Sequence, residues 1–361
     1  MWDKRLAVYS GSHLVIDFAC FFIVTGSFAP HVSVVPGLYF YGVFIYNLIA
    51  FALQAPLGYV IDLKRVRPFA MTMTGSLIVA AGVAAHAWPW VALVVVALGN
   101  ACFHLGGGID SLVNAQGRYT RPGVFISFGA LGVVLGTWTG TRGWLPVWAV
   151  MALLMVCAGL QYLVREARPW QGVAVFKLAT APIRRADVAI LVLMFVIVVR
   201  ALAGPLVDTP WKTGVLFTIV AAACVAAGKF TGGILADRFG ARNVAVVSLV
   251  VSAPLLTVWS GSIVAGCVGL LCFNIMTAVT LVTIASRLPG RPGFAFGLTT
   301  LALFAGTSIA MLFVISPAVR VPMLVGLIGA AVVSMILTTT NRGAPSVDAQ
   351  VASAGVAATV L

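Results

Sequence analysis

Twelve stretches of about 20 apolar residues, separated by breaks rich in charge, Pro and Gly, constrain this chain more than any other feature. Each stretch is long enough to cross a bilayer as an α-helix. Charged residues make up only 9% of the 361 residues, against roughly 25% in soluble globular domains. A water-soluble fold is therefore excluded, and an all-α membrane protein with twelve transmembrane helices is predicted. These helices are expected to begin near Leu6, Leu38, Phe69, Pro89, Gly123, Trp144, Val188, Gly214, Val244, Ser262, Phe294 and Val321.

One break is much longer than the others and divides the chain in two. The segment 164–187 is strongly basic and is predicted to be a cytoplasmic linker. It separates two predicted six-helix bundles, 1–163 and 188–340, which are followed by a polar cytoplasmic tail at 341–361. The basic residues of the linker are Arg165, Arg168, Lys177, Arg184 and Arg185.

The distribution of basic residues predicts the orientation in the membrane. If the N-terminus is cytoplasmic, all but five of the 22 Lys and Arg residues fall in cytoplasmic segments. Cytoplasmic loops of membrane proteins are enriched in Lys and Arg, so both termini are predicted to lie inside. The formal charge of +13 is thereby explained by topology, and no nucleic-acid partner is expected. The five exceptions are Arg142, Lys212 and Arg320 outside, and Arg200 and Lys229 within helices.

Catalytic and cofactor motifs are missing from the sequence. The six Cys residues all lie in apolar stretches without paired ligand spacing, so neither a disulfide framework nor a metal site is expected. The run 106–108 is Gly-Gly-Gly but lacks the Lys and Ser or Thr that follow in a nucleotide-binding loop. We therefore expect no enzyme activity and no cofactor.

Two short motifs occur once in each half. A Gly-x-x-x-Asp motif follows the second stretch at 58–62 and the eighth at 233–237, and Arg-Pro-Gly occurs at 121–123 and 291–293. Their offsets, 175 and 170 residues, are close to half the chain length and indicate a duplicated six-helix unit. The conspicuous loop residues are Gly58, Asp62, Arg65, Gly233, Asp237, Arg238 and Arg242.

At these loops the chain resembles the major facilitator superfamily, whose members carry G-x-L-x-D-R-x-G-R-R between the second and third helices and often again between the eighth and ninth. The resemblance implies a secondary transporter that works by alternating access, with the loops gating the cytoplasmic face. Asp62 and Asp237 are expected to accept hydrogen bonds from helix N-termini and to pair with Arg across the seam. The alternative is a solvated loop that only fixes topology.

Within that superfamily, four segments resemble the fosmidomycin-resistance type of exporter, which implies a bacterial inner-membrane protein. They are 13–17 in the first helix, 103–104 in the fourth, 199–201 in the seventh and 289–293 before the eleventh.

The fifth helix adds a separate resemblance, to an antiporter motif that is associated with export in exchange for protons. Its glycines are Gly123, Gly132, Gly136 and Gly140, although Thr137 stands where that motif has Pro. Close helix packing explains these glycines equally well.

Asp17 lies about 11 residues into the first helix, near the midplane of the membrane. His13 is four residues earlier on the same helical face and can share a proton or a hydrogen bond with it. Ionisable groups at this depth are costly and usually face a cavity or a partner. The pair is predicted to be the proton-coupling site; a purely structural pairing is the alternative.

Arg200 lies at similar depth in the seventh helix, without an acidic neighbour in that helix. Its guanidinium suits a carboxylate, phosphate or phosphonate, so an anionic substrate is favoured; an internal pair with Asp17 is the alternative. Lys229 is a secondary candidate, since its side chain can instead reach the interface. Further candidate substrate contacts, for which interhelical packing is the alternative, are Asn47, Asn100, His104 and Asn274.

Together these features predict a monomeric, proton-coupled secondary transporter that exports a small organic anion or a drug-like compound. Proton-coupled uptake of an organic anion is the alternative. A receptor or scaffold with the shape of a transporter is a further possibility. The expected partners are the substrate, protons and membrane lipid.

Overall fold

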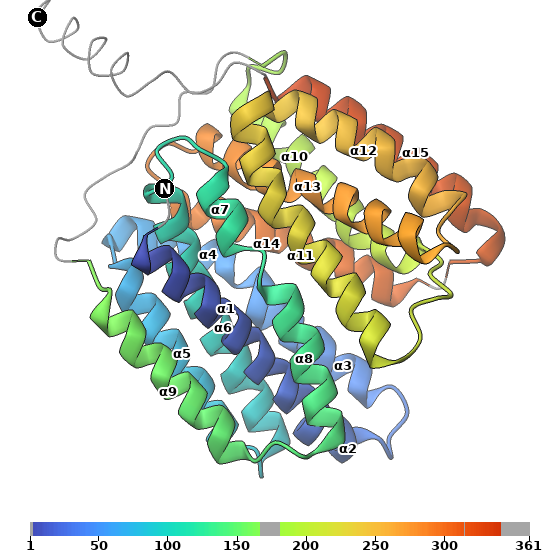
Figure 1. Ribbon diagram of the computed structural model, residues 1–361. Helices are drawn as coiled ribbons and strands as arrows, with labels where there is room; N and C mark the ends of the chain where they lie inside the picture. Colours follow the sequence, from blue (N-terminus) through green and yellow to red (C-terminus); the bar gives the residue numbers. More distant parts are fainter. Residues whose placement is uncertain (1–2, 167–180, 314, 341–361) are drawn as a thin grey trace, which may run out of the picture.

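The computed structural model describes residues 3–166, 181–313 and 315–340, and the regular structure in these ranges is entirely helical (Figure 1). The predicted tail at 341–361 lies outside the described residues, as does most of the predicted linker. An all-α membrane fold is therefore supported.

Two π-helical turns interrupt the helices of the first half, and a break at 126–128 divides another of them. π-Helical turns within α-helices are frequent at functional sites. In chain order the elements are α1 (Lys4–Ile23), η1 (Val24–Phe28), α2 (Ala29–Val32), α3 (Leu38–Asn47), η2 (Leu48–Ala52), α4 (Gln54–Lys64), α5 (Pro68–Ala84), α6 (Pro89–Val113), α7 (Thr120–Phe125), α8 (Gly129–Arg142) and α9 (Val147–Leu163).

The second half is more regular. Its helices are α10 (Ala186–Leu206), α11 (Gly214–Phe239), α12 (Ala241–Thr257), α13 (Ile263–Arg287), α14 (Pro292–Leu312) and α15 (Pro317–Thr338).

Nine helical stretches in the described ranges are long and apolar enough to cross a membrane, and α5, α9 and α12 are shorter apolar helices. Twelve crossings, and the orientation with both termini inside, stay predictions of the sequence.

Local sequence explains several helix ends. Pro stands at the first turn of α5, α6, α14 and α15, where its missing N–H costs nothing and its fixed φ suits the helix. Asp3 caps α1 by accepting a hydrogen bond from the backbone N of Leu6 at 2.7 Å. Helix α10 begins at Ala186, within two residues of the predicted end of the linker, and carries the acidic residue Asp187 in its first turn.

The two halves form adjacent groups of helices (Figure 1). In the first half α5 packs on α6 and α1 on α8, and in the second half α13 packs on α11 and α12. The halves meet where α4 contacts α14 and where α7 and α8 contact α11. Large apolar side chains such as Leu163, Leu191 and Val264 are exposed on the described surface, as expected for a surface that faces lipid.

The glycines of α8 allow α1 and α8 to approach closely. A Cβ on Gly132 would collide with the carbonyl of Leu14, and one on Gly136 with the carbonyl of Phe18. A Cβ on Gly140 would lie 2.7 Å from the carbonyl of Phe22. Helix packing thus accounts for these three glycines of the antiporter-like pattern.

Candidate functional site

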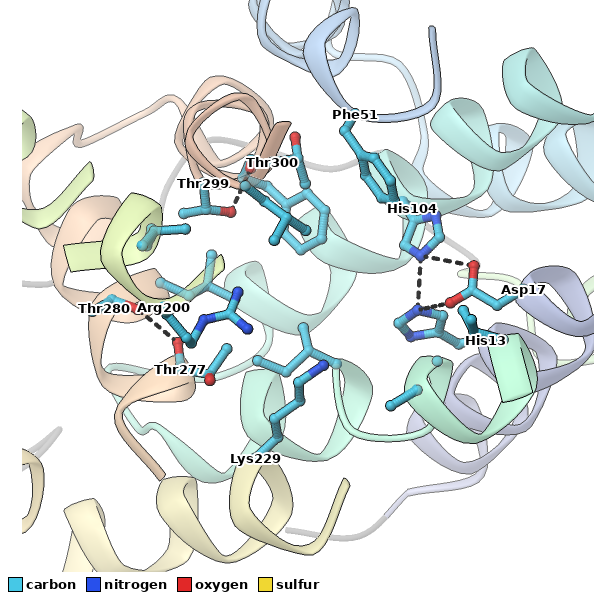
Figure 2. A pocket seen from close by; sticks show the side chains of 18 residues that line it. His13, Asp17, Phe51, His104, Arg200, Lys229, Thr277, Thr280, Thr299 and Thr300 are labelled. Atoms are coloured by element: carbon cyan, nitrogen blue, oxygen red, sulfur yellow. Dashed lines mark hydrogen bonds and ion pairs between the residues drawn. The ribbon is translucent and has the colours of Figure 1, made fainter. Parts of the chain in front are cut away.

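A cavity of about 220 Å³ lies between the two halves (Figure 2). The first half contributes a histidine and carboxylate cluster, and the second half contributes basic and hydroxyl groups. Apolar side chains, among them Phe51 from the η2 turn and Phe296 from α14, complete the wall. Its polar lining residues are His13, Asp17 and His104 on one side, and Arg200, Lys229, Thr277, Thr280, Thr299 and Thr300 on the other.

Asp17 is held by three side chains. Its Oδ1 accepts a hydrogen bond from Asn100 Nδ2 at 2.9 Å and lies 3.6 Å from His104 Nε2. Its Oδ2 lies 3.3 Å from His13 Nε2. The four side chains are buried, and they join α1 to α6 beside the cavity. The carboxylate therefore has a fixed position.

Both histidines of this cluster are anchored through their Nδ1 atoms. His13 Nδ1 lies 2.7 Å from the carbonyl oxygen of Phe125, and His104 Nδ1 lies 2.9 Å from that of Asn100. Their Nε2 atoms face each other at 2.7 Å. Sequence reasoning assigned His104 to substrate contact and missed this pairing, because the two histidines are 91 residues apart.

The break between α7 and α8 makes room for the cluster. Helix α7 ends at Phe125, and carbonyls in the last turn of a helix lack intrahelical partners. The Phe125 carbonyl is thus available to His13. Helix α8 resumes at Gly129, where a Cβ would lie 2.5 Å from His13 Nε2 and still closer to Asp17 Oδ2. Only a glycine fits there without displacing the cluster.

The opposite wall carries unsatisfied polar groups. Within the described ranges, neither Arg200 Nε nor Thr277 Oγ1 has a hydrogen-bond partner, although both atoms are buried. Arg200 and Lys229 both extend into the cavity (Figure 2). A buried polar atom without a partner costs roughly 1–3 kcal/mol. This wall is therefore suited to a ligand that accepts hydrogen bonds and carries negative charge.

The alternative pairing of Arg200 with Asp17 is not present. Among the described residues, Asp17 has only His13 and His104 within the 4.0 Å that defines an ion pair, and Arg200 has no acidic partner. Lys229, the secondary candidate whose side chain could alternatively reach the interface, lines the cavity.

Three predicted substrate contacts lie away from the cavity surface. Asn100 supports Asp17 from behind. Asn274 donates to the carbonyl of Leu270 in its own helix at 2.9 Å. Asn47 Nδ2 lies 3.9 Å from the sulfur of Met311. Asn47 and Asn100 thus contact neighbouring helices, whereas the hydrogen bond that Asn274 donates stays within its own helix.

The cluster also has the composition of a metal site, which the sequence did not predict: two histidines and a carboxylate, His13, His104 and Asp17. Their candidate ligand atoms lie within 4.8 Å of one another. However, Arg200 and Lys229 line the same cavity, so a divalent cation would add to positive charge that is already there. The 2.7 Å separation of the two Nε2 atoms is a normal hydrogen-bond distance. A proton fits this arrangement better than a metal ion.

The repeated sequence motifs meet across the seam between the halves. Asp62 at the end of α4 accepts hydrogen bonds from the backbone N of Gly293 at 2.9 Å and of Phe294 at 2.8 Å, at the start of α14. Asp237 near the end of α11 accepts from the backbone N of Tyr119 at 2.8 Å and of Thr120 at 2.9 Å, at the start of α7. Each Gly-x-x-x-Asp motif thus binds the helix start of the other half.

The motif glycines allow this close approach. A Cβ on Gly58 would collide with the carbonyl of Gly293, and one on Gly233 would lie 2.5 Å from the carbonyl of Tyr119. Backbone therefore packs on backbone at both contacts between the halves.

The basic residues of the motifs have other partners than predicted. Within the described ranges, neither Asp62 nor Asp237 forms an ion pair, because backbone N–H groups occupy their oxygens. Arg242 donates to the carbonyl of Thr339 after α15, Arg238 lies over the Phe239 ring, and Arg65 is an exposed residue with a left-handed backbone that ends α4. Of the two contacts expected for these aspartates, the described residues show the hydrogen bonds from helix N-termini and not the pairing with Arg.

No known protein-family profile and no curated protein matches the sequence. Solved structures do match in fold. A crystal structure of the Escherichia coli fucose:proton symporter FucP superposes with a TM-score of 0.66 at 12% identity, over 93% of this chain and 98% of that one. A structure of FucP described as a major facilitator superfamily transporter in the outward conformation gives 0.65 at 14% identity, over 94% and 100%. The human organic anion transporter MFSD10 gives 0.63 at 15%, also over 94% and 100%. The chain thus has the fold of major facilitator superfamily transporters.

Proposed function

We propose that this chain is a proton-coupled secondary transporter of a small organic anion that works by alternating access. One observation carries the proposal: a single cavity between the halves places unsatisfied basic and hydroxyl groups opposite a buried histidine and carboxylate cluster. The fold agrees with this function, since the similar solved structures are described as transporters. Both walls come from one chain, so a monomer is sufficient.

The second-half wall selects for negative charge. The Arg200 guanidinium stays charged at any working pH, and its planar group of donors matches carboxylate or phosphate oxygens. Lys229 and the free Thr277 hydroxyl add donors on the same side. The apolar remainder of this wall, which includes Ile197, Phe296 and Leu303, suits the organic part of such an anion.

The Asp62 and Asp237 contacts supply a gate. Each joins one half to the other through a carboxylate at a helix N-terminus, where negative charge is favourable. Opening the cavity toward this end requires that the four backbone N–H···O bonds break. We take this end as the cytoplasmic one, in line with the predicted topology, so the conformation described is closed toward the cytoplasm.

The direction of transport depends on how anion and proton influence each other. Opposite unit charges near each other attract by roughly 1–4 kcal/mol, depending on the effective dielectric constant. A protonated cluster therefore strengthens anion binding in the same cavity, and by linkage the anion strengthens proton binding. This electrostatic coupling favours movement of both in the same direction, which is uptake driven by the proton gradient.

Export of the anion or of a drug-like compound in exchange for protons is the second candidate. The sequence segments that resemble the fosmidomycin-resistance type of exporter favour it. Exchange requires that proton binding weakens substrate binding. A cationic substrate meets this requirement through charge repulsion, whereas an anion beside Arg200 does not.

Flux in proteoliposomes under an imposed pH gradient tests the proposal, with a panel of carboxylates, phosphates and phosphonates. Cotransport moves the anion from the acidic to the alkaline side, and exchange moves it the opposite way. Asp17→Asn is expected to abolish gradient-driven accumulation while anion exchange at equal pH continues. Unchanged proton coupling in this variant would remove Asp17 from the mechanism. Anion binding without flux would favour a receptor or scaffold.

A further inference from the structure

The hydrogen atoms of the two buried histidines can be assigned from their partners. A backbone carbonyl oxygen only accepts hydrogen bonds. His13 Nδ1 lies 2.7 Å from the carbonyl of Phe125, and His104 Nδ1 lies 2.9 Å from the carbonyl of Asn100. Both Nδ1 atoms therefore carry a hydrogen.

This assignment leaves the two Nε2 atoms to be explained. A neutral imidazole with hydrogen on Nδ1 has a lone pair and no hydrogen on Nε2. Two such lone pairs would face each other at 2.7 Å and repel. Two hydrogens would collide at the same distance. One proton between the nitrogens satisfies both, so the pair holds one positive charge in total.

We propose that the proton coupled to transport is the one shared between His13 Nε2 and His104 Nε2, and that Asp17 stays ionised throughout as its fixed counter-ion. This inference rests on the proposed function and names the atoms that hold the proton. His104 thereby becomes a proton-binding residue rather than a substrate contact.

The geometry around Asp17 favours the histidines over the carboxyl as the protonated group. Asp17 Oδ1 accepts a hydrogen bond from Asn100 at 2.9 Å, which stabilises the ionised form. Asp17 Oδ2 lies 3.3 Å from His13 Nε2, longer than a normal O–H···N hydrogen bond. A proton on the carboxyl would also leave the 2.7 Å contact between the nitrogens unexplained.

The charges that face the pair come from both halves. On its own side, α1 contributes Asp17 and α6 contributes His104 itself. The neutral thiol of Cys20 and hydroxyl of Tyr46 lie near Asp17, and residues 126–128 of the α7–α8 break include no titratable group. Across the cavity lie Arg200 on α10 and Lys229 on α11. Asp17 is the one acidic residue among the described residues that line the cavity.

These charges predict when the proton leaves. Asp17 holds it, whereas Arg200 and Lys229 repel it. A bound anion neutralises the two cations and so retains the proton; departure of the anion restores the repulsion and releases it. The histidine pair therefore acts as a proton store whose affinity follows occupancy of the opposite wall.

The location of the proton is testable by ¹⁵N NMR of histidine-labelled protein in lipid nanodiscs. The chain has four histidines, and the other two, His31 and His86, are exposed. Replacing both with Gln leaves only the pair. The expected spectrum shows hydrogen on both Nδ1 atoms and a scalar coupling between the two Nε2 atoms across one N–H···N bond. A bare Nδ1, or a protonated-carboxyl infrared band that disappears in Asp17→Asn, would overturn the inference.

Transport of His104→Gln, with His86→Gln as the matched control, separates coupling from substrate binding. Loss of proton-driven accumulation with intact anion exchange at equal pH is expected for His104→Gln, and no change in the control. A parallel loss of exchange would return His104 to substrate contact and overturn the inference. If the NMR signature is present but flux ignores pH, the proposed function fails instead. If the signature is absent but flux is proton-coupled, only the present inference fails.

Discussion

The two walls of the central cavity are built in opposite ways. In the first half, the ionisable groups of His13, Asp17 and His104 bond to one another, to Asn100 Nδ2 and to backbone. The one buried atom of this cluster without a partner among the described residues is Asn100 Oδ1, on a side chain that does not line the cavity. In the second half, Arg200 Nε and Thr277 Oγ1 are buried without a partner among the described residues. A satisfied network is rigid and retains its geometry when the cavity is empty. An unsatisfied one gains most when a ligand arrives.

This difference assigns a separate task to each half. Under the proposed function, the first half would hold the proton in a site that needs no ligand to be complete. The second half would hold the anion in a site that is incomplete without it. Because the two sites share one cavity, charge in one changes affinity in the other. Coupling thus requires no long pathway between them.

The largest expected effect is on the unsatisfied wall. Arg200→Ala removes the guanidinium and should weaken anion binding by roughly 10- to 100-fold, since a hydrogen bond to a charged group contributes about 1.5–3 kcal/mol. Isothermal titration with the transported anion measures this. Arg185→Ala, at an exposed position outside the cavity, is the control. Full affinity in Arg200→Ala would shift the substrate class to neutral or cationic compounds.

The satisfied wall can be broken without removing any of its polar groups. Gly129→Ala would place a Cβ 2.5 Å from His13 Nε2 and should displace His13 and Asp17. We expect proton-driven accumulation to fall roughly tenfold, equivalent to about 1.4 kcal/mol, with anion affinity nearly unchanged. Gly159→Ala is the matched control, because no atom lies within 4 Å of its added Cβ. Equal behaviour of the two variants would contradict the tight fit at Gly129.

The comparison of the halves extends to the seam, where each half contributes one aspartate. Asp62 is 8% exposed, whereas Asp237 is exposed to solvent. Asp62→Asn should therefore lower the free energy needed to open the seam by roughly 1–2 kcal/mol. Asp237→Asn should lower it by less than about 1 kcal/mol, because solvent screens that contact. Pulsed electron paramagnetic resonance measures the distance between spin labels placed at positions 64 and 239, in a background without the native cysteines. The distance distribution gives the populations with the seam open and closed. A larger effect of Asp237→Asn would reverse this ranking.

The smallest expected effect concerns the start of the first half. Asp3 caps α1 and forms an ion pair with Arg121 at 2.6 Å. Burial alone would raise the pKa of Asp3, but the hydrogen bonds from Arg121 and Leu6 lower it below its ordinary value of 3.8. A lowered pKa gives a stabilisation that is present above about pH 4 and lost as the pH falls through the folded-state value.

Asp3→Ala should therefore reduce the free energy of unfolding by about 1 kcal/mol at neutral pH, and by less under acidic conditions. Thermal unfolding in detergent at both pH values measures the difference. Asp3→Asn keeps the cap but loses the charge, so its free energy of unfolding should lie between those of the unchanged protein and Asp3→Ala. A loss that does not depend on pH would assign the whole effect to capping.

The sequence alone was sufficient for what depends on local pattern. Apolar length predicted the helical stretches to within a few residues, because the bilayer imposes the same requirement on every crossing. Helical periodicity placed His13 and Asp17 on one face. The repeated Gly-x-x-x-Asp and Arg-Pro-Gly motifs identified two of the places where the halves meet. The cost of burying charge singled out Arg200 as a candidate cavity residue, and it lines the cavity.

Tertiary structure alone decided which distant groups meet. His104 reaches His13 across 91 residues, and the Asp62 carboxylate reaches the N–H of Gly293 across 231. Neither contact follows from periodicity, since each depends on how closely two helices approach. That approach is set by backbone-to-backbone packing at glycines such as Gly58 and Gly129. The sequence therefore determined which residues are costly to bury, and the packing of the helices decided which partners offset that cost.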